Sequence, residues 1–354
     1  MATSQQIIDK RKSAEISDPA AKWWSPKGEK ILCELCPRYC EIGDGQAGFC
    51  FIRYNDGGVL RTKGYGRSTG FALDPIEKKP LFHVFPTKKI LSFGTAGCNM
   101  GCRFCQNWDI SKAKDDERMS SVFHAEQIVD DAYRLKQTSR NVGLAFTYND
   151  PTIWAEWAYD LAVLAKEQDL ISVMVTNGYM KKQAIKDVYP VIDAANVDLK
   201  SFTENFYFKQ TFSHLKPVLD GILWIKKEGT WIELTILLIT GKNDSTNEIQ
   251  ELCSWVKNYC GNETPLHFTA FHPDFKMRDV PHTPLSTLLK AYDIAKSTGL
   301  KYVYTGNVLD EETGSTYCPS CGKLLIRRNW YDVEIKGLTG NKCKYCSYEI
   351  KGIF

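Results

Sequence analysis

The sequence predicts an α/β protein with a partial (β/α) barrel at its centre, a cysteine-rich module before it and a zinc-ribbon-like module after it. Three observations predict this arrangement. Strand and helix patterns alternate through the middle of the chain, thirteen cysteines gather in short-spaced clusters, and one of these clusters follows the first strand of the alternation. We expect the N-terminal module to span residues 1–85, the barrel 86–307 and the C-terminal module 308–354.

The alternation predicts the barrel. Apolar runs typical of strands lie at 89–93, 142–147, 171–176, 195–199, 231–239, 266–271 and 301–305. Most of them are separated by apolar residues at helical spacing, within 128–135, 153–164, 218–225 and 285–292. Strands alternating with helices imply βαβ units and a parallel sheet, which six or seven units can curl into a full or partial barrel. In such barrels the chemistry gathers at the carboxyl ends of the strands.

Composition and charge exclude several classes of protein. The chain has 354 residues, 43% of them hydrophobic and 25% charged, and its 45 basic and 42 acidic side chains leave a formal charge of +3. These values exclude a disordered chain, a collagen-like fibre and a strongly basic nucleic-acid clamp. No stretch reaches the roughly 18 apolar residues of a membrane span. The first residues lack the apolar segment of a secretory signal, so we expect a cytoplasmic metalloprotein.

The first strand of the barrel leads into a cysteine motif. In GTAGCNMGCRFC, Cys98, Cys102 and Cys105 follow the spacing CxxxCxxC. Three thiolates can ligate three irons of one cubane cluster, and because iron–sulfur clusters normally take four cysteines, one iron stays open to another ligand. The alternative is a zinc site completed by a distant residue. The place of the loop after a strand favours the cluster.

Polar residues follow the second and third strands. FTYNDPTIW carries Tyr148, Asn149 and Asp150, and its Asp-Pro pair is also typical of a helix start. The same residues can present polar groups to the ammonium of a bound ligand. VTNGY, after the third strand, carries Thr176 and Asn177 in what can equally be a turn.

Charged residues mark the fourth and sixth strands. In VDLKS, Asp198 and Lys200 lie two residues apart and therefore on one face of the strand. If that face lines the barrel, the two charges pair or bind a ligand, because an unpaired buried charge is costly. His272 follows the sixth strand in AFHPDF and is either a core histidine or a site residue.

Two further cysteine groups flank the barrel. The closing group has the C-x₂-C…C-x₂-C form of a zinc ribbon, with iron as the alternative metal, and consists of Cys318, Cys321, Cys343 and Cys346. The N-terminal group can form either a zinc knuckle or an auxiliary iron–sulfur cluster, and consists of Cys33, Cys36, Cys40 and Cys50. Cys253 and Cys260 follow helical spacing with apolar neighbours and are expected in the core.

These motifs together resemble a known family. CxxxCxxC after the first strand resembles the signature of radical SAM enzymes, and the wider set is similar to the group of pyruvate formate-lyase activating enzyme. From Cys33 onward the chain looks like the radical SAM component of the AmmeMemoRadiSam system, on the segments CELCPRYCEIGDGQAGFC, SFGTAGCNMGCRFCQNWDIS, TYNDPTIW, VTNGY, AANVDLKSF, FHPDFKM and CPSCG…CKYC.

The resemblance implies a radical SAM core barrel and its chemistry. A [4Fe–4S] cluster on Cys98, Cys102 and Cys105 would bind S-adenosylmethionine (SAM) at its fourth iron and cleave it reductively to a 5′-deoxyadenosyl radical. That radical would abstract hydrogen from an unidentified substrate, for which a glycyl-radical protein fits the activating-enzyme resemblance and a small molecule, lipid or other protein is equally open. A one-electron donor such as flavodoxin or ferredoxin is implied as partner.

The resemblance also assigns contacts to SAM. Tyr148, Asn149 and Asp150 occupy the place of the segment that holds the methionine amino group, and Lys200 matches a lysine near the SAM carboxylate. The remaining implied contacts are Asp198, Thr176, Asn177 and His272. The competing hypothesis is a protein that carries only zinc and docks RNA or protein, but the nearly balanced charge argues against a nucleic-acid surface.

Overall fold

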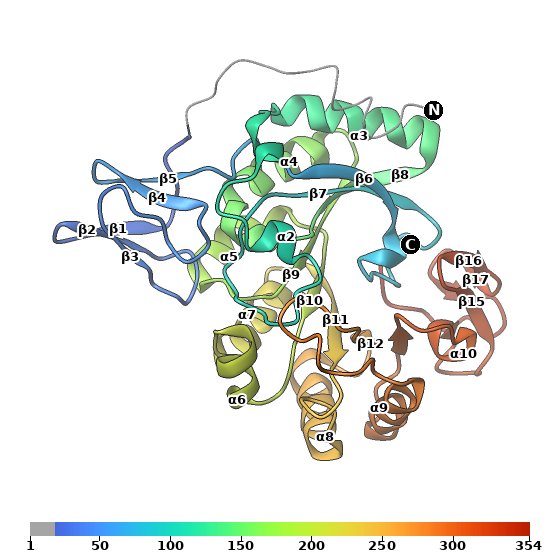
Figure 1. Ribbon diagram of the computed structural model, residues 1–354. Coiled ribbons are helices and arrows are strands. Elements are labelled where there is room, and N and C mark those ends of the chain that lie inside the picture. The colour runs from blue at the N-terminus through green and yellow to red at the C-terminus, as the bar shows by residue number, and fades with distance from the viewer. Residues whose placement is uncertain (1–17) are drawn as a thin grey trace.

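The structure is a computed structural model that describes residues 18–354. Its centre is an eight-stranded sheet in the order β13-β12-β11-β10-β9-β8-β7-β6, in which β7 to β13 run parallel and β6 is antiparallel to β7. The strands are β6 Gly70–Pro75, β7 Lys89–Gly94, β8 Asn141–Phe146, β9 Ile171–Thr176, β10 Ala194–Asp198, β11 Trp231–Leu238, β12 Leu266–Ala270 and β13 Val303–Gly306. Figure 1 shows the sheet curving from β6 to β13.

The longer helices pack against the outer face of this sheet, because each buries one apolar stripe. The helices are α2 Trp108–Ser111, α3 Ala125–Ser139, α4 Ala155–Glu167, α5 Lys182–Val188, α6 Glu204–Phe206, α7 Leu215–Lys227, α8 Thr246–Trp255, α9 Leu285–Thr298 and α10 Glu311–Gly314. In α3, for example, Ile128, Val129 and Ala132 are buried while polar residues face outward. The seven predicted strands and the four predicted helical stripes are confirmed, and Cys253 and Cys260 lie in the core as predicted.

One strand of the sheet has no counterpart among the predicted runs. β6, Gly70–Pro75, pairs with β7 along its full length, with Gly70 opposite Gly94. Its apolar residues are only half-buried, because it lies at the edge of the sheet. The central sheet therefore begins before residue 86, within the segment that the sequence assigns to the N-terminal module.

Small antiparallel sheets flank the central one. The N-terminal strands are β1 Trp24–Lys27, β2 Lys30–Cys33, β3 Glu41–Ile42, β4 Arg53–Asp56 and β5 Val59–Thr62. The C-terminal strands are β14 Thr316–Tyr317, β15 Leu324–Asn329, β16 Asp332–Ile335, β17 Leu338–Thr339 and β18 Lys342–Cys343. Figure 1 shows the two groups on opposite sides of the central sheet.

The C-terminal segment returns to the start of the sheet. Ile353 forms a parallel bridge with Val84, and its backbone exchanges hydrogen bonds with His83 and Phe85. The end of the chain therefore lies against the loop between β6 and β7. No helix within residues 18–354 has the length and apolar character needed to cross a membrane.

Candidate active site

The CxxxCxxC motif lies on the loop that leaves β7. A Cβ at Gly94, the last residue of β7, would collide with the backbone oxygen of Thr147, so only glycine lets this loop leave so close to the end of β8. Cys98, Cys102 and Cys105 are all free thiols. The motif therefore lies at the carboxyl edge of the sheet, where the sequence predicts it.

Two of the motif thiols have a raised pKa. Burial is the largest effect on Cys98 and raises the pKa of its thiol to about 12, although nearby Lys112 acts to lower it. Burial also raises the pKa of Cys102, against the opposing effect of Lys200. Without a metal, both thiols therefore stay protonated at neutral pH. A positively charged metal centre would favour their thiolate forms, which are the forms that bind metal. Cys105 lies 3.1 Å from the hydroxyl oxygen of Ser111.

Asparagine side chains attach the cysteine loop to the neighbouring strand ends. The amide nitrogen of Asn149 donates to Thr95 Oγ1 at 2.9 Å and to the carbonyl oxygen of Gly97 at 3.0 Å. Asn99, inside the motif, accepts from the side chain of Asn177 at 2.8 Å and donates to the carbonyl oxygen of Tyr179 at 2.9 Å. Sequence reasoning missed Asn99, although its place between two ligand candidates was a usable signal.

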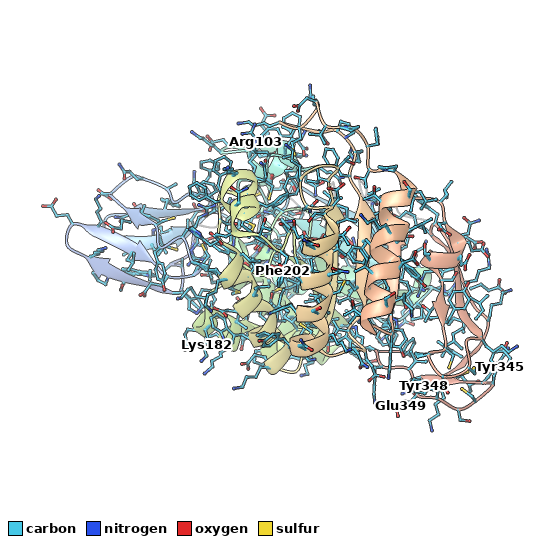
Figure 2. All side chains as sticks on the ribbon, turned by 90° about the horizontal axis from the view of Figure 1, so that it is seen from below. Arg103, Lys182, Phe202, Tyr345, Tyr348 and Glu349 are labelled. Atoms are coloured by element: carbon cyan, nitrogen blue, oxygen red, sulfur yellow. The ribbon has the colours of Figure 1, made fainter. Side chains whose placement is uncertain are left out.

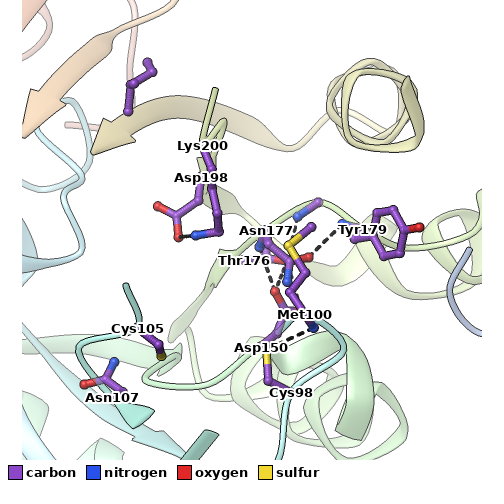
Figure 3. A network of polar contacts seen from close by, with 12 residues as sticks. Cys98, Met100, Cys105, Asn107, Asp150, Thr176, Asn177, Tyr179, Asp198 and Lys200 are labelled. Atoms are coloured by element: carbon purple, nitrogen blue, oxygen red, sulfur yellow. Dashed lines mark hydrogen bonds and ion pairs between the residues drawn. The ribbon is translucent and has the colours of Figure 1, made fainter. Parts of the chain in front are cut away.

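The Asp150 carboxylate accepts hydrogen bonds from neighbouring groups of the protein. It accepts from the backbone N–H of Thr152 at 2.9 Å, as the predicted helix cap, and from the backbone N–H of Asn177 at 2.7 Å. The hydroxyl of Thr176 donates to it as well. Burial is the largest effect and raises the pKa of Asp150, although the hydrogen bonds from Asn177 and Thr152 act to lower it. Figure 3 shows Asp150, Thr176 and Asn177 together beside Cys98, so the structure joins the second and third predicted segments.

Tyr148 directs its ring away from this group. Its backbone has a φ of 70°, and its hydroxyl donates to Asp74 at 2.8 Å. Asp74 also forms an ion pair at 2.7 Å with Lys79, which is buried. The carbonyl oxygen of Tyr148, in contrast, accepts from Asn107 at 2.7 Å beside the cysteine loop. No sequence motif indicated the Asp74–Lys79 pair.

Asp198 and Lys200 form an ion pair at 2.9 Å. The side chain of Lys200 is 15% exposed and that of Asp198 is 35% exposed. Burial acts to lower the pKa of Lys200, but Asp198 and Cys102 outweigh it and hold the pKa above its usual value. The pair thus lies within electrostatic reach of the cysteine motif (Figure 3).

His272 lies apart from these buried residues. Its side chain is exposed, and its ring centroid is 6.3 Å from that of His282. It follows β12 at the same carboxyl edge as the cysteine loop. Nearby, Trp108 stacks on Phe275 at 5.5 Å, and the Trp108 indole donates to Asp274 at 3.1 Å.

The N-terminal cysteines gather next to the same loop. Cys33, Cys40 and Cys50 are close enough to Cys36 that their charge adds to burial, the largest effect, in raising the pKa of Cys36. Gly97, with a φ of +82°, is the point of contact, because a Cβ there would collide with the carbonyl oxygen of Cys50. The four-cysteine group is therefore in direct backbone contact with the loop of the CxxxCxxC motif.

The closing cysteines form a compact group of four. Their sulfur atoms all lie within 4.8 Å of one another, with Cys318 and Cys346 at 3.6 Å and Cys321 and Cys343 at 3.7 Å. Four thiolates about 2.3 Å from one tetrahedral ion would lie about 3.8 Å apart. The group therefore has the size of a mononuclear metal site. Within residues 18–354, the other two cysteine groups do not meet this spacing.

Comparison with known proteins identifies the class. Residues 93–256, from the end of β7 to the end of α8, match the Radical SAM superfamily. These residues form a Radical SAM domain, and the protein is an enzyme of the radical SAM type. A domain of this superfamily implies a [4Fe–4S] cluster, SAM and a source of electrons.

One relative matches almost the whole chain. The chain is 43% identical over 323 residues to the uncharacterized protein MJ0808 of Methanocaldococcus jannaschii, across 91% of this chain and 95% of the relative. The two proteins belong to one family. The name of this relative gives no substrate.

Solved structures share the fold. A radical SAM methyltransferase from Sphaerobacter thermophilus has a TM-score of 0.50 and 15% identity, covering 68% of this chain and 71% of that one. SuiB of Streptococcus suis, bound to its precursor peptide SuiA, has a TM-score of 0.50 and 11% identity, covering 66% of this chain and 51% of that one. At such low identity these likenesses concern the α/β fold alone.

Proposed function

We propose that Cys98, Cys102 and Cys105 hold a [4Fe–4S] cluster whose fourth iron binds SAM. The observation that carries the proposal is the convergence of three free thiols on one loop at the carboxyl edge of the sheet, with Lys200 beside Cys102. When bound and reduced by one electron, this cluster supplies cleavage of SAM to methionine and a 5′-deoxyadenosyl radical, which takes a hydrogen atom from the substrate. The AmmeMemoRadiSam subgroup is the finer assignment that the sequence motifs support.

The residues around the loop have distinct proposed roles. Lys200 binds the SAM carboxylate as its cationic partner, with Asp198 orienting the ammonium group. Asn149 and Asp150 are positioning residues, because their side-chain atoms already bond to the loop and to the end of β9. Tyr148 offers its backbone rather than its ring, since the hydroxyl is engaged by Asp74.

Thr176, Asn177 and His272 complete the proposed SAM site. Thr176 and Asn177 act through Asp150 and Asn99, which they contact directly. His272 is exposed at the end of β12 and is the proposed contact on the far side of SAM. Its replacement by Ala should raise the concentration of SAM needed for half-maximal binding without lowering the thermal stability.

Replacement of a motif cysteine tests the central assignment. Cys102→Ala should abolish reductive SAM cleavage and remove the iron of the central cluster, because three thiolates are needed to hold the cubane. Iron content, the visible spectrum and 5′-deoxyadenosine are measured on anaerobically reconstituted protein. Cys253→Ala is the matched control, since Cys253 is a buried cysteine without a metal role.

Two results would contradict the assignment. Retained SAM cleavage in Cys102→Ala would remove this cysteine from the cluster. A colourless wild-type protein that carries zinc and no iron would instead support the competing function, a zinc-containing docking module.

The outer cysteine groups have separate proposed roles. The closing group holds a structural metal, with zinc proposed over iron, because four thiolates leave no open coordination position. The N-terminal group is proposed as an auxiliary iron–sulfur site, supported by its contact with the motif loop at Gly97 and by its wider spacing. Metal analysis of Cys36→Ala and Cys346→Ala separates the two, because each should lose only its own metal.

The electron donor is proposed to be an acidic one-electron carrier such as flavodoxin or ferredoxin. A hollow beside the motif loop is lined by four cationic side chains, Arg103, Lys209, Lys242 and Lys276, against one acid, Asp279. Backbone hydrogen bonds join its segments, from Arg103 N–H to the carbonyl oxygen of Gln210 and from Lys276 N–H to that of Arg103. Two exposed rings, Phe208 and Phe212, lie in the same hollow. This mixture of positive charge and apolar surface suits an acidic partner.

Charge reversal at this hollow separates docking from chemistry. Arg103→Glu with Lys276→Glu should slow cluster reduction by flavodoxin hydroquinone about tenfold or more at low salt, because rim charges act mainly on association rates. Reduction by dithionite should be unaffected. Lys182→Glu is the control, since Lys182 lies on the opposite side of the molecule in Figure 2. Equal rates with flavodoxin for the variant and the wild type would contradict docking at this surface.

A further inference from the structure

A cavity lies where the two edges of the central sheet face the C-terminal module. Its walls come from the segment after β6, from the ends of β12 and β13, and from the β15–β16 hairpin. Figure 1 shows this module beside β13, with the C-terminus near the end of β6. Its lining includes Glu77, Phe82, His267, Arg328, Trp330 and Tyr331.

The size of the cavity limits its occupant. The centres of water molecules have about 100 Å³ of room in it, and its total empty volume, which includes open solvent at the mouth, is about 660 Å³. Thr269 and Asn307 place one end of it at the carboxyl edge of the sheet, the edge on which Asp198 and Lys200 lie. The space suits a small organic molecule that reaches toward the proposed radical site, rather than a folded segment of another protein.

Arg328 is the unusual member of the lining. It is 2% exposed, and its two amino groups donate to Thr316 Oγ1 and to the carbonyl oxygen of Phe82, each at 2.7 Å. Its Nε is buried without a hydrogen-bond acceptor. Within the described chain no carboxylate oxygen lies within 4.0 Å of its guanidinium. The Nε–H of Arg328 is therefore an unused donor, buried at the wall of the cavity.

The other charged groups of the lining are already engaged. Lys78 pairs with Asp74 at 2.9 Å, and Asp310 caps α10. Glu77 accepts a backbone hydrogen bond at 2.8 Å, and burial raises the pKa of this carboxyl. Burial lowers the pKa of Arg328, and the opposing effects of Tyr304, Glu77 and Glu233 are weaker. A buried cation of this kind is costly unless an anion meets it.

Aromatic rings supply the rest of the walls. Phe82 lies under the Arg328 guanidinium, 4.2 Å from the ring centroid, and packs edge-on against His267. Trp330 and Tyr331 form the tip of the β15–β16 hairpin and are 50% and 43% exposed. Such half-exposed rings at a cavity mouth can pack against the apolar or planar part of a ligand.

We infer that this cavity holds the substrate, a small organic anion whose carboxylate or phosphate is bound by Arg328 and whose apolar part packs against Phe82, Trp330 and Tyr331. The inference rests on the proposed radical SAM function and deepens it. Guanidinium N–H groups match the paired oxygens of both anions. The C-terminal module therefore shapes the substrate site in addition to closing the fold.

The test uses small molecules from an extract of the native host. The extract is filtered to remove macromolecules, and the filtrate is divided on an anion exchanger into retained and unretained fractions. Each fraction is added to reconstituted full-length enzyme with SAM and dithionite, and 5′-deoxyadenosine is measured relative to the uncoupled rate of the same preparation. We expect stimulation by the retained fraction.

Variants connect the stimulation to the cavity. Arg328→Met should reduce the stimulation at least tenfold, and Arg328→Lys should restore part of it. Arg327→Met is the matched control, because its neighbouring side chain pairs outside the cavity with Glu311 and Asp332. If Arg328→Met fails to fold, Trp330→Ala, an exposed position at the hairpin tip, should still raise the amount of fraction needed for half-maximal stimulation.

Several results would overturn the inference. They are stimulation confined to the macromolecular or the unretained fraction, no stimulation by any fraction, and equal responses of Arg328→Met and Arg327→Met. Failure of the proposed function is distinct, because it abolishes the uncoupled formation of 5′-deoxyadenosine in wild type before any fraction is added.

Discussion

Lys200 is held by its backbone independently of its side chain. Its N–H donates to the Tyr207 hydroxyl at 3.0 Å, and its carbonyl oxygen accepts from Asn243 at 2.8 Å. The ammonium group reaches Asp198 and no other carboxylate within the described residues. Replacement of the side chain should therefore leave the strand end in place and report on the ligand.

Lys200→Ala should weaken SAM binding. Removal of one member of a buried charge-assisted pair costs about 2–5 kcal/mol, much of it from the charge left behind. The dissociation constant should rise by about tenfold or more, as each 1.4 kcal/mol is about a factor of ten. Lys200→Met should behave similarly, and Asp198→Asn should have a smaller effect. Equilibrium binding to reconstituted protein measures this, and an unchanged dissociation constant with lower thermal stability would identify a structural ion pair.

His83 makes stability depend on pH. It is fully buried, its Nδ1–H donates to the carbonyl oxygen of Lys351 at 2.7 Å, and its Nε2 accepts from the Tyr304 hydroxyl at 2.7 Å. Burial, the largest effect, lowers the pKa of His83 to about 4, with Glu233 opposing it. Between this value and its ordinary pKa, the unfolded chain binds a proton that the folded chain does not. Stability contributed by neutral His83 is therefore lost as the pH falls.

The expected loss is about 2 kcal/mol between about pH 7 and about pH 5. Urea unfolding across this range measures it in the wild type and in His83→Gln. The variant should have lower stability at neutral pH and a flatter pH dependence. Parallel curves for the two proteins would show that another group causes the dependence.

Helix α7 supports the Thr176–Asn177 segment through glycine. A Cβ at Gly221 of α7 would collide with the carbonyl oxygen of Gly178, the residue that follows Asn177. Gly178 has a φ of +67°, so its own conformation also favours glycine. The helix therefore approaches the turn at backbone distance, and its position determines where Asn177 meets the cysteine loop.

Gly221→Ala should lower the free energy of unfolding by about 1–3 kcal/mol, because a methyl group has no space at this contact. It should also weaken SAM binding through the displaced turn. Thermal unfolding and SAM titration measure the two effects. Lys227→Ala, an exposed position at the end of the same helix, should change neither. Wild-type stability of Gly221→Ala would mean that the helix moves without cost.

At the scale of the whole molecule, metal at the closing cysteines should stabilise the fold. Cys346 is exposed, so Cys346→Ser removes a ligand without opening the core. Metal present at a thousand times its dissociation constant contributes about 4 kcal/mol. The variant should melt at lower temperature, lose the dependence on added zinc and retain the iron of the central cluster. Tyr345→Ala, also exposed, is the control. Iron at this site in purified protein would favour a redox role instead.

The same module covers the gap between β6 and β13. Arg328 bonds to Phe82 across a separation of 246 residues, and the Glu233 carboxylate accepts from the N–H groups of Phe82 and His83 at 2.9 and 2.8 Å. The C-terminal module and the segment after β6 thus meet at the open side of the central sheet. Loss of the closing metal should therefore affect the proposed substrate cavity as well as stability.

The sequence by itself determined the local features of this protein. Apolar periodicity identified β7 to β13 and the main helices, because a strand or helix repeats its buried side at a short spacing. Cysteine spacing identified the motif loop and the closing group, because the candidate ligands of each lie in closely spaced motifs along the chain. Asp198 and Lys200 were expected on one face, where they would pair or bind a ligand, and the structure places them in an ion pair at 2.9 Å.

Only the tertiary structure decided which distant residues meet. β6 was missed because its residues are half-buried at a sheet edge, where periodicity is weak. The Asp74–Lys79–Tyr148 contacts, the attachment of Asn99 to Asn177, and the cavity around Arg328 join segments that carry no common pattern. Such contacts depend on how the sheet curves and how its edges are covered, which is a property of long-range packing and is not encoded in any single stretch of the chain.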